Sequence, residues 1–217
     1  MKKPTMSSQV LAAIAAALAC TTASAQLTLP IERPQLKTGD SWVYRNVDNW
    51  TRNETSRSAI TFVGAENDQW QFRSQRLPDA QPSTFTVNTD YQPCRSMRNS
   101  STAVCAGMTR FPLTEGWKHA YKELPWPNGQ GHSSAECVGH GIETVEVPAG
   151  KFEAYRIQCK GYWTRIFEGS SSGRFEETTW YVPAVKRSVR HEYNSFRPNG
   201  QADAKNLSEL VEFKPAP

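Results

Sequence analysis

Apolar and polar residues alternate along most of the chain after residue 40, a period of two that is typical of β-strands with one buried face. Around Trp70 and Phe72, for example, the neighbouring positions are Gln69, Gln71 and Arg73. Patterns of this kind predict strands at 41–48, 56–63, 69–73, 84–89, 116–123, 136–147, 151–163, 174–182, 186–196 and 206–213. The last segment fits a helix about as well, and we predict a strand. About ten strands in an antiparallel meander predict an all-β fold, a strongly curved sheet or partly closed barrel.

The longest predicted hairpin, residues 136–163, is closed by a turn at Pro148, Ala149 and Gly150. Proline presets φ for the first turn position, and glycine suits a left-handed residue followed by a bulge. This chemistry predicts a three-residue loop in which Val147 faces Lys151. The hairpin therefore sets the register from which the rest of the sheet is predicted.

Two cysteines lie on the strands of this hairpin. Counting from the turn places Cys137 opposite Gly161 and diagonal to Cys159, on the same face of the sheet. Diagonal neighbours are slightly too far apart for a disulfide, so we expect a β-bulge at Gly139 or Gly141 to bring the sulfur atoms together. Alternatively, these glycines only relieve crowding.

The remaining cysteines outside the N-terminal segment are Cys94 and Cys105. With Cys137 and Cys159 they make an even number in a chain expected to be exported, which predicts two disulfides. The hairpin favours Cys137 with Cys159, and this leaves Cys94 with Cys105 around a short polar segment. A zinc site is the alternative, but the sequence has no Cys-x-x-Cys spacing, so we predict no metal and no cofactor.

Residues 141–157, with the sequence VPAGKF at their turn, resemble the signature of a broad bacterial periplasmic family of unknown function built around a VPAGxF β-hairpin. Residues 38–42, 111–117 and 180–189 also resemble parts of that family. The resemblance implies an antiparallel, curved β-sheet protein of the cell envelope. Since the family has no established activity, it assigns no functional residue.

The first 25 residues predict a secretory signal peptide. Lys2 and Lys3 precede an apolar run at 10–19, and the Ala-Ser-Ala sequence at 23–25 predicts cleavage before residue 26. The apolar run is about half the roughly 20 residues that span a bilayer. Anchoring as a lipoprotein through Cys20 is a less favoured alternative, because the preceding leucine is one place too near the cysteine.

The remaining residues, 26–217, are enough for one domain with a hydrophobic core, and we predict a single β-domain. It begins with an extended arm at 26–37 that contains Pro30 and Pro34. The full chain has a formal net charge of +4, two units of which belong to the signal peptide. A charge this small, without a run of basic residues, argues against nucleic acid as a partner.

Candidate catalytic groups are few. The Gly-x-Ser-x-Gly pattern at 169–173 is followed by a predicted strand instead of the helix of a hydrolase, so we predict a turn. The histidines, at 119, 132, 140 and 191, are predicted at solvent edges, with His140 between two glycines as the one candidate for a functional role. Glu176 and Glu177 are adjacent in a strand and point to opposite faces, so they cannot act as a pair.

The chain has seven tryptophans, which fill the core of a curved sheet or line a cleft inside it. For a cleft we name Trp42, Trp117, Trp163 and Trp180 as candidate ligand-binding residues. We therefore predict a periplasmic binding or accessory module, more readily than an enzyme, whose concave face is self-filled or holds an apolar or amphiphilic ligand or a segment of an envelope protein. The alternative is an envelope hydrolase whose site the sequence does not show.

Overall fold

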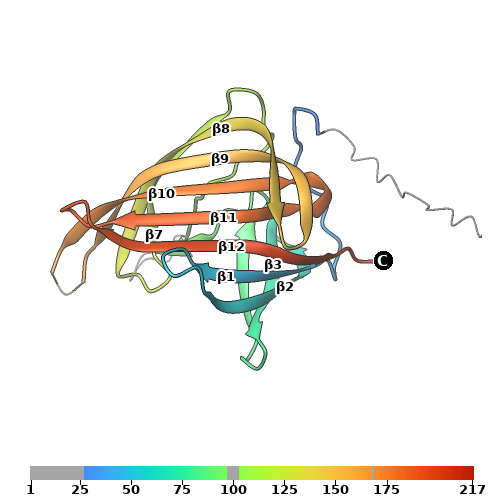
Figure 1. Ribbon diagram of the computed structural model, residues 1–217, viewed down its shortest axis with the longest axis horizontal. Coiled ribbons are helices and arrows are strands. Elements are labelled where there is room, and N and C mark those ends of the chain that lie inside the picture. Colours follow the sequence, from blue (N-terminus) through green and yellow to red (C-terminus); the bar gives the residue numbers. More distant parts are fainter. Residues whose placement is uncertain (1–26, 97–102, 168) are drawn as a thin grey trace, which may run out of the picture.

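The computed structural model describes residues 27–96, 103–167 and 169–217, so the predicted signal peptide and Cys20 lie outside the described residues. Within these ranges, no helix is long and apolar enough to span a bilayer. The elements, seen in Figure 1, are β1 (Ser41–Asp48), β2 (Glu54–Glu66), β3 (Gln69–Leu77), β4 (Ser83–Asn88), β5 (Cys94–Ser96), β6 (Ala103–Cys105), β7 (Lys118–Pro125), β8 (Gly131–Val147), β9 (Gly150–Arg165), β10 (Ser171–Val182), the 3₁₀ turn η1 (Pro183–Val185), β11 (Arg187–Phe196) and β12 (Ala202–Lys214).

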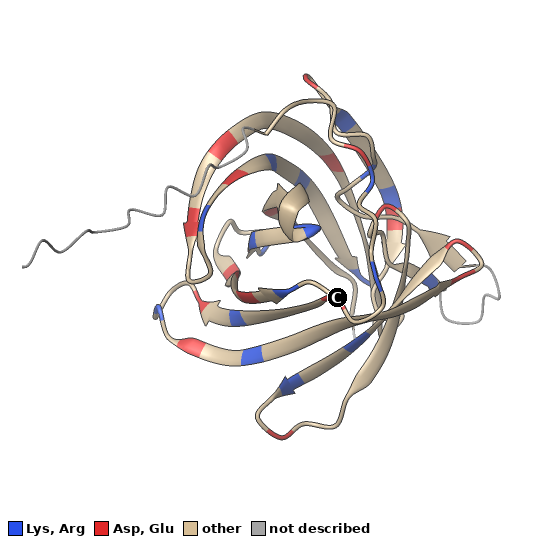
Figure 2. Ribbon diagram, turned by 90° about the vertical axis from the view of Figure 1, so that its right-hand side faces the viewer, with Lys and Arg blue, Asp and Glu red and all other residues tan. Residues whose placement is uncertain are grey.

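Ten strands form one antiparallel sheet in the order β4-β3-β2-β1-β12-β11-β10-β9-β8-β7, and β5 pairs with β6 in a separate small sheet. The predicted all-β antiparallel fold of about ten strands is therefore confirmed. β4 and β7 are the outer strands of the sheet, which is not closed into a barrel. Figure 2 shows the strands curling around the interior of the molecule.

The sheet is two runs of sequential strands joined by the pairing of β1 with β12. Trp42 lies opposite Phe213 in this pairing, so segments from near the two ends of the chain meet in the middle of the sheet. A simple meander would instead place β7 beside β4. The connection between those two strands contains the separate β5–β6 sheet and two prolines, Pro93 and Pro112, which lack the N–H that a ladder requires.

The core lies on the concave side of the sheet, where the predicted alternation places the apolar side chains. In β3, Trp70 and Phe72 are buried, whereas Arg73 on the other face is exposed. Trp42, Tyr155 and Leu113 are fully buried. Period-two patterning thus decides which face of each strand is buried, and the curl of the sheet brings those faces together.

The turn between β8 and β9 is tighter than predicted. Val147 pairs with Gly150, so the loop has two residues, and the predicted pairing of Val147 with Lys151 is wrong by one residue. The backbone N–H of Ala149 donates a hydrogen bond of 3.0 Å to Leu210 O, which attaches the turn to β12. Gly150 has a φ of 135°, a conformation that side chains rarely adopt. The turn residues alone could not reveal the contact with β12.

A register shift between Gly139 and Ile142 interrupts the β8–β9 ladder, where the sequence led us to expect a bulge. Beyond it, Cys137 lies directly opposite Cys159, and the two form a disulfide. Gly139 also relieves crowding: a Cβ there would lie 1.9 Å from the Tyr155 hydroxyl. That hydroxyl donates a hydrogen bond of 2.6 Å to Thr114 O. The bulge therefore brings the two cysteines opposite each other, and Gly139 also avoids a clash with Tyr155.

The second disulfide joins Cys94 and Cys105, which pair directly across the small β5–β6 sheet. Before β1, Ile31 forms an isolated bridge with Leu113 and is buried beside it. The N-terminal arm is thereby held against the segment that leads into β7.

Candidate ligand-binding cavity

A cavity of about 560 Å³ opens inside the curl of the sheet. Its lining comes from both ends of the sheet, with Ile60 and Phe85 on β2 and β4, and Tyr121 and Trp163 on β7 and β9. The volume falls within the roughly 300–1,000 Å³ of small-molecule sites. Much of the wall is apolar, formed by Phe85, Met108, Leu124, Trp126, Trp163 and Phe175. The concave face is therefore partly hollow, and not filled throughout by its own side chains.

Glu177 and His191 form an ion pair on the cavity wall, with Nε2 of the imidazole 2.7 Å from Oε1 of the carboxylate. Burial lowers the pKa of His191, but the hydrogen bond and charge of Glu177 outweigh this effect and raise it above the ordinary value. We predicted His191 at a solvent edge; its side chain is 38% exposed, but it also pairs with Glu177 on the cavity wall, which was not predicted. Thr179 pairs with His191 and Tyr193 with Glu177 because the β10–β11 register shifts between Trp180 and Tyr181. A count from Pro183 without that bulge would place His191 opposite Thr178, so the turn does not indicate this diagonal contact.

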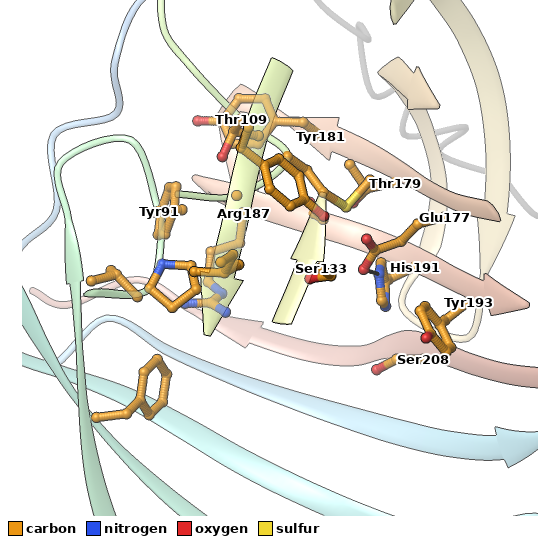
Figure 3. A pocket seen from close by; sticks show the side chains of 18 of the residues that line it. Tyr91, Thr109, Ser133, Glu177, Thr179, Tyr181, Arg187, His191, Tyr193 and Ser208 are labelled. Atoms are coloured by element: carbon orange, nitrogen blue, oxygen red, sulfur yellow. Dashed lines mark hydrogen bonds and ion pairs between the residues drawn. The ribbon is translucent and has the colours of Figure 1, made fainter. Parts of the chain in front are cut away.

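Two tyrosines lie near this ion pair. Tyr121 and Tyr193 line the same part of the cavity, and burial raises the pKa of both hydroxyls, to which the negative charge of Glu177 adds. They therefore stay protonated at neutral pH and can donate hydrogen bonds. Figure 3 shows Tyr193 and Ser208 beside Glu177 and His191.

Arg187 lies at the other side of the cavity, together with Tyr91 and Tyr181 (Figure 3). Its guanidinium carbon is 5.2 Å from the ring centre of Trp42, 5.0 Å from Phe72 and 5.3 Å from Tyr91. These distances are within the range of cation–π attraction. The cavity thus has a cationic region on aromatic rings and, apart from it, a carboxylate paired with a histidine.

The structure separates the four predicted ligand-binding tryptophans. Trp163 lines the cavity, with the ring of Trp126 6.3 Å away. Trp42 is fully buried beneath Arg187 and donates from Nε1 to Val185 O at 2.8 Å. Trp117 is buried and donates to Arg110 O, whereas Trp180 lies on the opposite face of β10 from Tyr181 and donates to Glu143. For Trp163 the ligand-binding role stays a prediction.

The described residues contain no group of three or more His, Cys, Asp or Glu side chains that could hold a metal ion. The Gly-x-Ser-x-Gly segment leads into β10, which begins at Ser171, so the strand-to-helix turn of a hydrolase is not formed there. His140 is exposed in the β8 bulge, and His119 lies 3.3 Å from the Gln92 side chain. The polar chemistry of the cavity therefore rests on Arg187, Arg95, the tyrosines and the Glu177–His191 pair.

No protein-family model matches the chain, and no curated protein matches it. Two solved structures are similar in fold. One is a Bacteroides fragilis protein with a YMCC-like fold that is inferred to be exported, with 13% identity and a TM-score of 0.46. The other is an inferred lipoprotein of Parabacteroides distasonis, with 14% identity and a TM-score of 0.47. Each comparison covers 85% of this chain and 99% of the other chain. The role of the cavity has to follow from its own residues, and the VPAGxF family resemblance stays a prediction.

Proposed function

We propose that residues 26–217 act as a single periplasmic β-domain that binds an amphiphilic ligand in the cavity of its curved sheet. The observation that carries this proposal is the cavity of about 560 Å³, whose wall combines aromatic and aliphatic side chains with a few polar groups. Ligand sites in proteins commonly have this composition. The two disulfides support export, because such bonds persist in oxidising compartments.

A core of this size, if it served stability alone, would be expected to fill its space. Protein interiors pack at the density of organic crystals, and the few voids they contain are usually little larger than a water molecule. A water in a liquid occupies about 30 Å³, so the cavity is many times larger than such a void. The unfilled volume therefore favours a ligand over a purely structural role.

The experiment is a binding titration with the neutral fluorescent probe N-phenyl-1-naphthylamine, using exported protein purified without detergent. We expect the probe to bind with a blue-shifted emission, because the cavity would remove it from water. Ser208→Phe should weaken binding by tenfold or more: Ser208 lines the cavity, and the new ring would take up part of the space.

Thr84→Phe is the matched control, since Thr84 is exposed on β4 and outside the cavity lining. It adds the same ring to the surface and should leave the probe affinity unchanged. Equal affinity in both variants and the unmodified chain would place the probe elsewhere and contradict the proposal, as would the absence of binding.

An envelope hydrolase is the second candidate, and the Glu177–His191 pair favours it because a carboxylate can orient a histidine as a general base. In a serine-hydrolase triad, however, the carboxylate contacts Nδ1 and Nε2 faces the nucleophile, whereas Nε2 contacts Glu177 here. Ester hydrolysis by the purified chain that is lost in His191→Asn would support this candidate. Binding without turnover would support the first.

A further inference from the structure

The cavity contains a cation without an acidic partner. Among the ion pairs of the described residues, none involves Arg187. The nearby carboxylate of Asp40 is occupied by Lys186, at 2.8 Å, and Glu177 is occupied by His191. Nη1 of Arg187 is buried and has no hydrogen-bond partner among the described residues. Leaving a buried guanidinium donor unpaired costs free energy of folding. An acceptor for Nη1 would remove that cost.

The hydroxyl of Tyr181 is a second buried donor that lacks an acceptor among the described residues. Tyr181 is only 1% exposed, and its hydroxyl has no hydrogen-bond partner among the described residues. The neighbouring tyrosines are satisfied, because Tyr44 donates to Ser188 O and Tyr91 donates to Lys186 O. Burial raises the pKa of Tyr181, so its hydroxyl keeps its proton and stays a donor. Two buried donors without a partner among the described residues, one of them charged, therefore belong to side chains that line the same side of the cavity.

The aromatic rings keep the guanidinium in this position without using its Nη1 donor. Trp42, Phe72 and Tyr91 contact Arg187 through their rings, and the Tyr44 hydroxyl lies beside the guanidinium. Nη1 still has no acceptor among the described residues. A planar guanidinium presents paired N–H groups that match the two oxygens of a carboxylate or of a phosphate. The missing acceptor is therefore best supplied by an anionic group with several oxygens.

We propose that Arg187 and Tyr181 hold the anionic oxygen head group of the amphiphile, a carboxylate or a phosphate monoester, while its hydrocarbon chain lies against the apolar wall of the cavity. This inference rests on the proposed function and specifies its ligand class. The wall that would contact the chain includes Phe85, Met108, Leu124, Trp163 and Phe175. Glu177, away from Arg187, would repel an anion and so favours one orientation of the ligand (Figure 3).

The experiment measures displacement of N-phenyl-1-naphthylamine by dodecanoate, dodecyl phosphate and dodecanol, which share one chain and differ in head group. We expect at least one of the two anions to bind about tenfold or more tightly than dodecanol, the effect of one charge-assisted hydrogen-bonded contact. The better of the two anions identifies a carboxylate or a phosphate as the head group.

Two variants test the named donors. Arg187→Met should remove most of the preference for the anion and leave dodecanol within about twofold of its original affinity. Tyr181→Phe should weaken anion binding by about threefold or more without lowering the melting temperature of the empty protein, because it removes a buried hydroxyl that has no partner. A purely structural role for the hydroxyl would give the reverse result.

Arg190→Met is the matched control. Arg190 is also on β11 and also lies over a ring, 5.2 Å from Trp180, but it pairs with Glu192 outside the cavity. It should leave all three affinities unchanged. If dodecanol competes as well as both anions in the unmodified chain, or if Arg187→Met keeps the full anion preference, the head-group site is wrong although the cavity still binds. If no probe binds at all, the proposed function itself fails.

Discussion

Near Asp40 the interior of the sheet is closed by the chain's own polar groups, whereas near Arg187 and Glu177 it is hollow. Asp40 is fully buried and accepts hydrogen bonds from Lys186 Nζ at 2.8 Å, Lys37 N at 2.8 Å and Ala216 N at 2.9 Å. Its partners join the N-terminal arm, the segment after η1 and the C-terminal tail. At the cavity, Glu177 pairs with His191, while Tyr181 and Arg187 each have a donor without a partner in the part of the chain that the structure describes.

The difference separates a structural use of buried charge from a ligand-binding one. A buried carboxylate whose partners are all supplied by the chain fixes segments relative to one another. Donors left unsatisfied on side chains that line a cavity contribute no such contact, and they are consistent with a partner that comes from outside the chain. The predictions below test whether the two regions differ in this way.

The largest effect is expected from Asp40→Ala. The substitution leaves the ammonium group of Lys186 and two backbone N–H groups without their acceptor, which should cost about 3–5 kcal/mol of unfolding free energy. Urea denaturation measures this loss. The control, Glu177→Ala, should cost less than about 1 kcal/mol, because its partner is part-exposed and can become neutral. Equal losses in the two variants would remove the distinction between the regions.

Acid unfolding tests the same carboxylate. Burial alone would raise the pKa of Asp40, but the hydrogen bonds from Lys186, Lys37 and Ala216 outweigh it and hold the pKa below its ordinary value. A lowered pKa in the folded state contributes stability above the unfolded pKa of about 4, and this stability is lost as the pH falls through the folded value. In Asp40→Asn the loss of stability below about pH 4 should be smaller.

The two disulfides should give the next largest effects. Cys137→Ala removes a buried bridge between β8 and β9 in the sheet wall, and we expect a cost of about 2–4 kcal/mol. Cys94→Ala should cost less, because its bridge closes the small exposed β5–β6 sheet. Chemical denaturation under non-reducing conditions measures both.

The same two variants also test whether the small β5–β6 sheet supports the cavity. Pro93 and Arg95, on either side of Cys94, line the cavity. Cys94→Ala should therefore weaken the affinity for the probe, although its cost in unfolding free energy is small. A larger stability loss for Cys94→Ala than for Cys137→Ala would show that the small sheet is part of the main core.

The smallest effect concerns His191. Because Glu177 raises the pKa of the imidazole, Glu177→Gln should lower the pKa that an NMR titration of His191 measures. A raised folded pKa contributes stability below about pH 6.5, and that contribution is lost as the pH rises through the folded value. For a part-exposed pair it should stay under about 1 kcal/mol. An unchanged titration would show that the two side chains do not interact in solution.

Most of the strands could be predicted because the alternation of apolar and polar residues that indicates them is local in the sequence. The alternation around Trp70 and Phe72 decides which face of β3 is buried, and it does so without reference to any other strand. The bulge near Gly139 was also predictable, since Cys137 and Cys159 could not otherwise pair. The size of the β8–β9 loop was not, because Ala149 hydrogen-bonds to Leu210, a residue 61 positions away in the sequence.

The candidate site could be predicted only in part. Glu177 and His191 lie on sequential strands, but the register shift between Trp180 and Tyr181 brings them to the same face, and the turn residues do not reveal that shift. Arg187 and Trp42 belong to different parts of the chain and meet because β1 pairs with β12 and the sheet curls. No local pattern shows that a particular cation will lack a carboxylate, since that depends on every side chain packed around it.

The sequence by itself determined the strand type, the buried face of most strands and the position of the main hairpin, because steric and hydrophobic preferences act over a few residues. Tertiary structure decided the order of strands, the hollow inside the curl and the partners of the buried charges. Those features depend on how strands distant in sequence pack, and the chain leaves Arg187 and Tyr181 unsatisfied only once that packing is complete.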